Sequence, residues 1–159
     1  MTEDLKFVVD GMLGKIARWL RILGYDVKYE NSLDDLSLIK IAQDERRILL
    51  TRDILLYRRA IAKRINSILL EDESRFSNLV KLSREVGIKL EIDTLTSRCP
   101  KCNSRIEPVT KVSVHGKVPE KTFERLNEFW LCPNCGQVYW RGSHWRNIYS
   151  IIERVRSVS

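Results

Sequence analysis

Apolar and polar positions alternate with two different periods along residues 1–96. Four short apolar runs predict β-strands, at residues 5–9, 25–30, 47–51 and 66–70. Four longer segments carry apolar residues at helical spacing and predict α-helices, at residues 13–24, 34–45, 53–64 and 74–87. Strands that alternate with helices of this length are joined by right-handed crossovers. The pattern therefore predicts an α/β fold with a mostly parallel sheet.

The remainder of the chain has shorter patterned segments. Three of them predict strands and one predicts a helix, at residues 88–92, 111–116, 127–132 and, for the helix, 119–126. A boundary is expected near residues 94–98, just before the first cysteine. It divides the chain into a domain of residues 1–96 and a smaller module of residues 97–159 that ends in a helix.

Each of the first four predicted strands is followed by acidic residues. In chain order these acids are Asp10, Asp34 with Asp35, Asp53, and Glu71 with Asp72. Because parallel sheets bind ligands at the carboxyl ends of their strands, we expect these side chains to lie along one edge. Carboxylates in one cleft repel each other unless a cation neutralises them. Mg²⁺ and Mn²⁺ prefer such oxygen ligands and can activate a water molecule against a phosphodiester.

A structural interpretation of the same acids is also open. Aspartate is common at helix N-caps and in turns, and each of these positions fits one of those roles. The N-terminal part contains no histidine and no cysteine, so metal-bound carboxylates are the chemistry that its residues favour.

The charge of the chain is unevenly distributed. The 28 Lys and Arg residues against 21 Asp and Glu residues leave a net charge of +7. Residues 1–96 hold 17 cationic and 16 anionic side chains, whereas residues 97–159 hold 11 and 5. The basic surplus therefore lies in the C-terminal third and indicates a surface for a polyanion, with an ordinary solvated surface as the alternative.

The four cysteines form two C-x-x-C pairs in the basic third. They are Cys99, Cys102, Cys132 and Cys135. Two such pairs suit one tetrahedral Zn²⁺, and because all four ligands come from the protein, the zinc is expected to be structural. A redox pair is disfavoured outside a βαβ unit, and a disulfide is disfavoured in a cytosolic protein.

Aromatic and cationic residues interleave in the segment 139–147. Arg141, His144 and Arg146 are expected to contact nucleic acid, since cations hold phosphates and aromatic rings stack on bases. Trp140 and Trp145 have a second interpretation, in which they pack in the seam between the two parts of the chain.

Four motifs, taken in order, are similar to those of the Mut-seven C-terminal RNase family. They are FVVDGMLGKIARWLRILGYDVKY (7–29), RILLTRDILLYRR (47–59), SRCPKCN (97–103) and CPNCGQVYWRGSHW (132–145). The resemblance covers nearly the whole chain. It implies a PIN-like three-layer fold with an appended zinc ribbon, a divalent-metal phosphodiesterase site and an RNA substrate.

The resemblance also implies roles for individual residues. The first acid of the family falls on Asp10 and the acid of the TRD motif on Asp53, while Asp35, or Asp34 in its place, opens the second helix. A fourth acid would be Asp72, with Glu71 as the alternative. Four cations beside these acids are expected to hold phosphates, namely Lys15, Arg18, Arg21 and Arg52.

The sequence therefore predicts a ribonuclease, with endonuclease action favoured, that uses Mg²⁺ or Mn²⁺ and acts in RNA processing or decay. A non-catalytic adaptor that binds RNA or a ribosome is the alternative, and the toxin of a toxin–antitoxin pair is a third interpretation. Because the chain lacks an apolar run of about 20 residues and its N-terminus lacks the features of a signal peptide, the expected location is the cytoplasm. A ribosome or an RNA-processing complex is a candidate partner.

Overall fold

The computed structural model describes residues 4–159, and its first part is built on a four-stranded parallel sheet. The strands lie in the order β2-β1-β3-β4. Their bounds are β1 Lys6–Val9, β2 Asp26–Tyr29, β3 Ile48–Thr51 and β4 Ser67–Leu69. All three strand pairs are parallel, which confirms the predicted α/β class.

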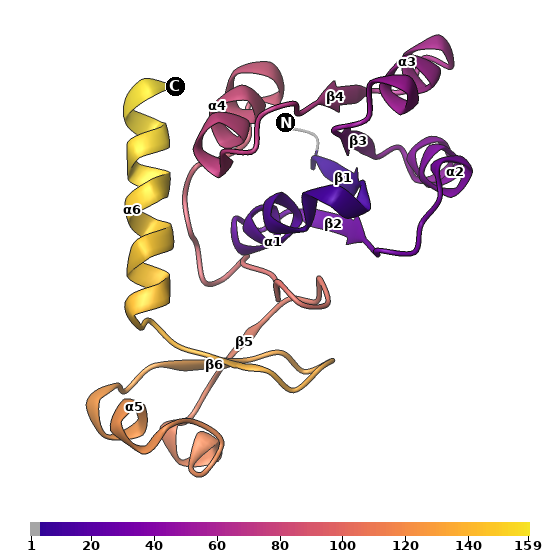
Figure 1. Ribbon diagram of the computed structural model, residues 1–159. Coiled ribbons are helices and arrows are strands. Elements are labelled where there is room, and N and C mark those ends of the chain that lie inside the picture. Colours follow the sequence, from indigo (N-terminus) through magenta and orange to yellow (C-terminus); the bar gives the residue numbers. More distant parts are fainter. Residues whose placement is uncertain (1–3) are drawn as a thin grey trace.

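Helices cover both faces of this sheet and make three layers (Figure 1). On one face, Val8 and Leu49 pack against α2 (Asp35–Glu45) and α3 (Ile54–Ala62). On the other face, the neighbouring residues Phe7, Val9 and Leu50 pack against α1 (Gly14–Ile22) and α4 (Arg75–Val86). Successive residues of a strand point to opposite faces, so the continuous apolar runs of β1 and β3 supply both layers.

The helices begin and end at residues whose chemistry suits those positions. Asp34 caps α2 by accepting from the backbone N–H of Ser37 at 2.8 Å, and Ser74 caps α4. Gly87 follows α4 with φ at 68°, a left-handed conformation that glycine adopts without strain. Among the described residues, no helix has both the length and the apolar composition needed to cross a membrane.

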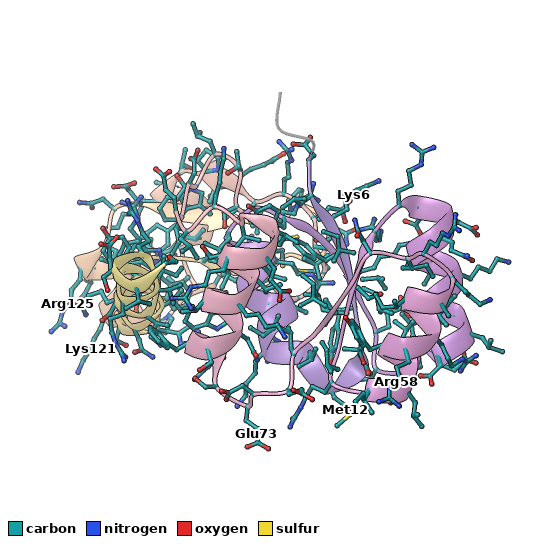
Figure 2. The ribbon with its side chains drawn as sticks, turned by 90° about the horizontal axis from the view of Figure 1, so that it is seen from above. Lys6, Met12, Arg58, Glu73, Lys121 and Arg125 are labelled. Atoms are coloured by element: carbon teal, nitrogen blue, oxygen red, sulfur yellow. The ribbon has the colours of Figure 1, made fainter. Side chains whose placement is uncertain are left out.

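The C-terminal module contains a second, antiparallel sheet in the order β5-β6-β7. Its elements are β5 Glu107–Val109, the 3₁₀ helix η2 Lys111–Val114, α5 Glu120–Arg125, β6 Phe129–Leu131 and β7 Val138–Tyr139. Val114, Phe129 and Val138 form its small core. Lys121 and Arg125 on α5 point away from the rest of the molecule (Figure 2). A core of this size cannot hold the module together alone, so a metal ion or neighbouring contacts must stabilise it.

Two of the strands predicted from sequence are absent from the described residues. The segment 111–116 contains η2 instead, in which Val114 is buried while Val112 is 83% exposed. The segment 88–92 has no strand partner, although Ile88 is buried in the main core and its alternate neighbours pack against it. In residues 88–92 the alternation reflects side-chain burial without the backbone pairing that defines a strand. In residues 111–116 the two alternating valines differ in burial, because the backbone turns into η2.

The C-terminal helix α6 (Ser143–Val158) returns to the first part of the chain and lies beside α4 (Figure 1). Its apolar face contributes Ile148, Ile152 and Val155 to the core cluster that includes α1 and α4. The proposed division at residue 96 therefore separates the two sheets, while α6 packs into the larger core. That division stays a prediction.

Two side chains fasten the first cysteine turn to the parallel sheet. The guanidinium of Arg21, which is 4% exposed, donates twice to the carbonyl of Val27 and once to that of Pro100, at 3.1, 2.8 and 2.9 Å. Asn103 accepts from the backbone N–H of Val27 at 2.9 Å and donates to Asp26 at 2.7 Å. These hydrogen bonds, which we call the joint, connect the first cysteine turn to β2.

These contacts predict that substitutions of two arginines in α1 change the stability of the protein by very different amounts. Replacing Arg21 by methionine should lower the free energy of unfolding by about 3 kcal/mol, because it leaves buried carbonyls without donors. Replacing the exposed Arg18 by methionine should change it by less than about 0.5 kcal/mol. Urea unfolding of the two zinc-loaded variants measures this difference. Equal stabilities would show that the joint contributes nothing.

Candidate functional site

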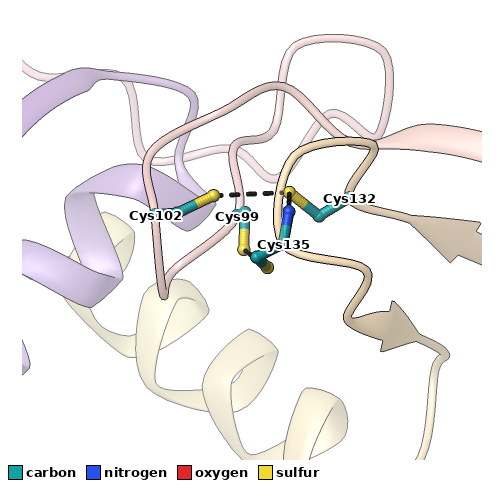
Figure 3. Close-up of side chains that lie close together, drawn as sticks. All are labelled: Cys99, Cys102, Cys132 and Cys135. Carbon is teal, nitrogen blue, oxygen red and sulfur yellow. Dashed lines mark hydrogen bonds between the residues drawn. The ribbon is translucent and has the colours of Figure 1, made fainter.

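The four cysteines come together between two turns, which are formed by residues 99–102 and 132–135 (Figure 3). Their sulfur atoms all lie within 4.8 Å of one another. The closest pairs join one cysteine from each turn, with Cys99 and Cys135 sulfurs 3.7 Å apart and Cys102 and Cys132 sulfurs 3.4 Å apart. All four are free cysteines, and no disulfide joins any two of them.

The two turns are built in the same way. In the first, the backbone N–H of Cys99 donates to Ser104 and that of Asn103 donates back to Cys99, at 2.7 and 2.9 Å. In the second, the matching bonds join Cys132 with Gln137 and Gly136 with Cys132, both at 2.9 Å. The residue after the second cysteine has a positive φ in each turn, 75° at Asn103 and 80° at Gly136. These are the residue types that adopt such a conformation most readily.

The sulfur positions fit a metal ion such as zinc. A tetrahedral ion with Zn–S bonds of about 2.3 Å places its sulfurs about 3.8 Å apart, close to the shortest separations here. Burial raises the pKa of Cys99, and it raises the pKa of Cys132 to about 12. Burial also opposes ionisation of Cys102, but hydrogen bonds from Asn134 and Ser104 lower its pKa to about 6. A divalent cation would allow all four thiols to ionise together.

Groups outside the cysteine set support the same site. The hydroxyl of Tyr139 lies 2.9 Å from the sulfur of Cys99. Burial raises the pKa of Tyr139 above its usual range, so the hydroxyl keeps its proton and can donate to the thiolate. Burial lowers the pKa of Arg21, while the thiolates of Cys102 and Cys99 act in the opposite direction. The buried cation of the joint thus offsets the negative charge of a four-thiolate site.

A second constellation lies at the carboxyl edge of the parallel sheet. Asp10 follows β1, and Thr51 ends the adjacent strand β3. The fully buried hydroxyl of Thr51 donates to Asp10 Oδ2 at 2.8 Å and accepts from the backbone N–H of Asp53 at 2.9 Å. The structure therefore places the two predicted acids on either side of one hydroxyl.

The other predicted acids take up local roles. Asp53 Oδ1 caps α3 by accepting from the backbone N–H groups of Leu55 and Leu56 at 2.8 and 3.3 Å. Asp35 lies 3.8 Å from Arg59 in an exposed ion pair. Asp34 caps α2, and Asp72 accepts from the backbone N–H of Ser74 at 2.8 Å. Glu71 is exposed.

The cysteines form the one group within residues 4–159 in which three or more possible ligand atoms of histidine, cysteine or acidic side chains lie within 4.8 Å of one another. The acids therefore share an edge without forming such a cluster. Asp10 and Asp53 are linked through Thr51, whereas Asp35 and Asp72 are bonded elsewhere. The role of Thr51 was not predicted from the sequence. The one feature that could have indicated it is that a hydroxyl residue ends the predicted strand two positions before Asp53 of the TRD motif.

The cations predicted to hold phosphates in this part lie in different environments. Lys15 and Arg18 are exposed on α1. Arg52 lies 3.4 Å from Glu73 in an exposed ion pair. The expectation for Arg21 is wrong, because its buried guanidinium is bonded to backbone carbonyls and cannot reach a phosphate. Arg21 was expected to be a surface cation because, in the sequence, it lies outside the apolar stripe of α1.

The aromatic segment that spans the start of α6 gathers several planar groups. The guanidinium of Arg141 lies 5.2 Å from the ring centre of Trp130 and 5.4 Å from that of Trp145. Trp145 in turn stacks on Tyr149, with ring centres 5.2 Å apart. His144 and Arg146 are exposed. These residues occupy the junction between the ribbon-like module and α6.

These observations define a class of protein: a three-layer α/β domain with acids at the carboxyl edge of its sheet, joined to a four-cysteine module that can hold a metal ion. The chain belongs to the Mut7-C RNAse domain family, whose model matches residues 5–152. This match confirms the resemblance found from the motifs. No curated protein and no solved structure matches the chain.

The cysteine geometry makes a prediction about metal content. Replacing Cys102 by serine should reduce bound zinc from about one ion per chain to nearly none, because a soft thiolate ligand is lost. Replacing Tyr139 by phenylalanine should keep the ion but weaken its affinity by about tenfold, because one donor to Cys99 is lost. Elemental analysis and competition with a chromogenic chelator measure the two quantities. Full zinc content in the Cys102→Ser protein would contradict the site.

Proposed function

We propose that this protein is a metal-dependent ribonuclease, with endonuclease action, and that its first part is a PIN-like domain. The observation that carries the proposal is the link from Asp10 through Thr51 to Asp53 at the carboxyl edge of the sheet, in a member of an RNase-named family. Parallel sheets bind ligands at this edge.

Each of the two carboxylates keeps an oxygen that is suited to a cation. Thr51 engages Asp10 Oδ2, and the cap of α3 engages Asp53 Oδ1. Among the described residues, Asp10 Oδ1 and Asp53 Oδ2 have no hydrogen-bond partner or ion pair. Hard divalent cations such as Mg²⁺ and Mn²⁺ prefer oxygen ligands of this kind. When bound here, such an ion would activate water and stabilise the charge on a phosphodiester.

The chain's own residues would hold this edge ready for the reaction. Thr51 fixes the carboxylate of Asp10, and the helix cap fixes that of Asp53. Asp35 is our third ligand, because an exposed ion pair with Arg59 contributes little and exchanges readily. Asp34 is its substitute, and Asp72 is the candidate fourth acid.

We propose that RNA is held by cations of both parts. Lys15 and Arg18 are exposed on α1, which begins just after Asp10, and Arg52 lies between Thr51 and Asp53. Arg141, His144 and Arg146 would contact the RNA at the second module. The metal ion of that module would be a structural zinc. A cytoplasmic location fits the four reduced cysteines. RNA processing or decay, with a ribosome or an RNA-processing complex as partner, is the proposed setting.

One observation favours a second candidate function. No three acids within residues 4–159 have ligand atoms within 4.8 Å of one another. A non-catalytic adaptor that binds RNA or a ribosome would need no such cluster. Titration of the zinc-loaded protein with Mn²⁺ separates the candidates, because the nuclease requires a binding site that depends on Asp10 and the adaptor does not.

The nuclease proposal predicts metal-dependent cleavage that depends on Asp10. With Mn²⁺, the wild-type protein should cleave labelled linear and circular single-stranded RNA, and the circular substrate reports endonuclease action. Replacing Asp10 by asparagine should slow cleavage by about a hundredfold or more, equivalent to about 2.7 kcal/mol of transition-state stabilisation.

The matched control is Asp44→Asn. Asp44 is exposed near the C-terminal end of α2, at the opposite edge of the sheet from Asp10. This variant should cleave at the wild-type rate. Equal rates for the Asp10 variant and the wild type, at equal zinc content, would reject the assignment.

A further inference from the structure

A cavity of about 420 Å³ lies where the second module meets α6 and the end of α1. This volume falls in the range of small-molecule sites. Its planar and cationic lining residues are Arg98, Trp130, Tyr139, Trp140, Arg141, His144 and Trp145. No aspartate or glutamate within residues 4–159 lines it. Glu128, which is exposed, lies 3.9 Å from Arg141.

The lining chemistry favours a flat ligand that carries negative charge. Indole and phenol rings offer π-faces to a heterocycle, and Arg and His offer positive charge to an anion. Trp140 and Trp145 both line the cavity and are partly exposed. Trp145 already stacks on Tyr149 and has Arg141 5.4 Å from its ring centre, whereas no aromatic ring of the described residues stacks on Trp140. Most of the other lining residues are apolar, such as Ile22, Ile92 and Ile148, and they suit the uncharged ring of a base while the cations suit a phosphate. A nucleotide combines the flat ring and the negative charge.

The start of α6 adds a place for a phosphate. The helix has 16 residues, and its N-cap is Gly142, which offers no side-chain cap. Among the described residues, no acceptor bonds the backbone N–H groups of Ser143, His144 and Trp145. These groups carry the positive end of the helix dipole, and Ser143, His144 and Trp145 all line the cavity.

Residue 142 has little room for a side chain, which explains why a glycine occupies this position. A Cβ atom there would lie 3.0 Å from Nε1 of Trp140 and 3.2 Å from its neighbouring ring carbon. The indole of Trp140 therefore lies close across the start of α6 because residue 142 has no side chain. This contact places an aromatic ring beside the unbonded N–H groups.

We propose that this cavity binds one nucleotide of a single-stranded RNA. The base would lie against Trp140 and the exposed part of Trp145, and the phosphate at the start of α6 beside Arg141. This inference rests on the proposed function for its choice of RNA, but it concerns a place remote from the acids. The cavity contacts Ile22 at the end of α1, whereas Asp10 precedes the start of that helix. The site anchors the substrate and takes no part in cleavage.

Binding measurements without added Mg²⁺ or Mn²⁺ test the site independently of cleavage. The probe is a fluorescein-labelled, unstructured 20-nucleotide RNA, and fluorescence anisotropy measures its Kd for the zinc-loaded full chain. Replacing Trp145 by alanine should weaken binding by about tenfold, within the range that one base–aromatic stack provides. Trp145→Phe should recover most of the affinity and guards against a folding defect.

Arg141→Ala should also weaken binding by about tenfold, because it removes a charge beside the phosphate. Its matched control is Arg125→Ala, which removes the same charge from an exposed position on α5 (Figure 2) and should change Kd by less than about twofold. A blunt RNA duplex should bind more weakly and without dependence on Trp145, because its bases are not available for stacking.

The inference is overturned if Trp145→Ala and Arg125→Ala bind the 20-nucleotide RNA equally well, or if the duplex shows the same dependence on Trp145. Free uridine 5′-monophosphate tests whether a single nucleotide suffices. Its binding should quench tryptophan fluorescence more strongly than uridine does, and equal quenching would reject the phosphate contact. If the protein cleaves RNA but Trp145→Ala binds RNA as well as the wild type does, only the nucleotide site is rejected. If Trp145→Ala weakens binding but the wild-type protein does not cleave RNA, only the nuclease is rejected.

Discussion

The hydroxyl of Thr51 sets the relation between the two acids on which the proposed chemistry depends. It is fully buried at the end of β3, it donates to Asp10, and it accepts from the backbone of Asp53. The parallel pairing of β1 with β3 brings these residues together, although more than 40 positions separate them in the chain. The hydroxyl thus ties the carboxylate of Asp10 to the backbone of Asp53 at the carboxyl edge of the sheet.

The second part of the protein is positioned by equally specific contacts. Arg21 and Asn103 bond the first cysteine turn to β2, and α6 returns to pack Ile152 and Val155 into the core that contains α1 and α4. The metal-binding module is therefore held at the opposite end of α1 from the acids. A rigid separation of this kind suits a protein that anchors a flexible strand at one place and acts on it at another.

The sequence predicted the parallel sheet, its helices and the cysteine group, because periodicity and short-range spacing encode them. It could not predict that Arg21 is buried, since its partners Val27 and Pro100 lie on a strand and a turn that only the tertiary fold brings together. The same limit hid Thr51, the packing of α6 and the cavity beside Trp140. The alternation at 88–92 was misleading because burial of every second side chain does not require a paired strand. The alternation at 111–116 was misleading because the backbone forms η2, which buries Val114 and exposes Val112.

The most direct test of the account is a crystal of the zinc-loaded protein soaked in Mn²⁺, with anomalous scattering used to locate the ion. The account predicts an anomalous peak at the carboxyl edge of the sheet, bonded to a carboxylate oxygen of Asp10 and one of Asp53 and absent from the Asp10→Asn protein. A manganese-saturated crystal with no peak between these two residues would contradict the claim that they share a catalytic cation.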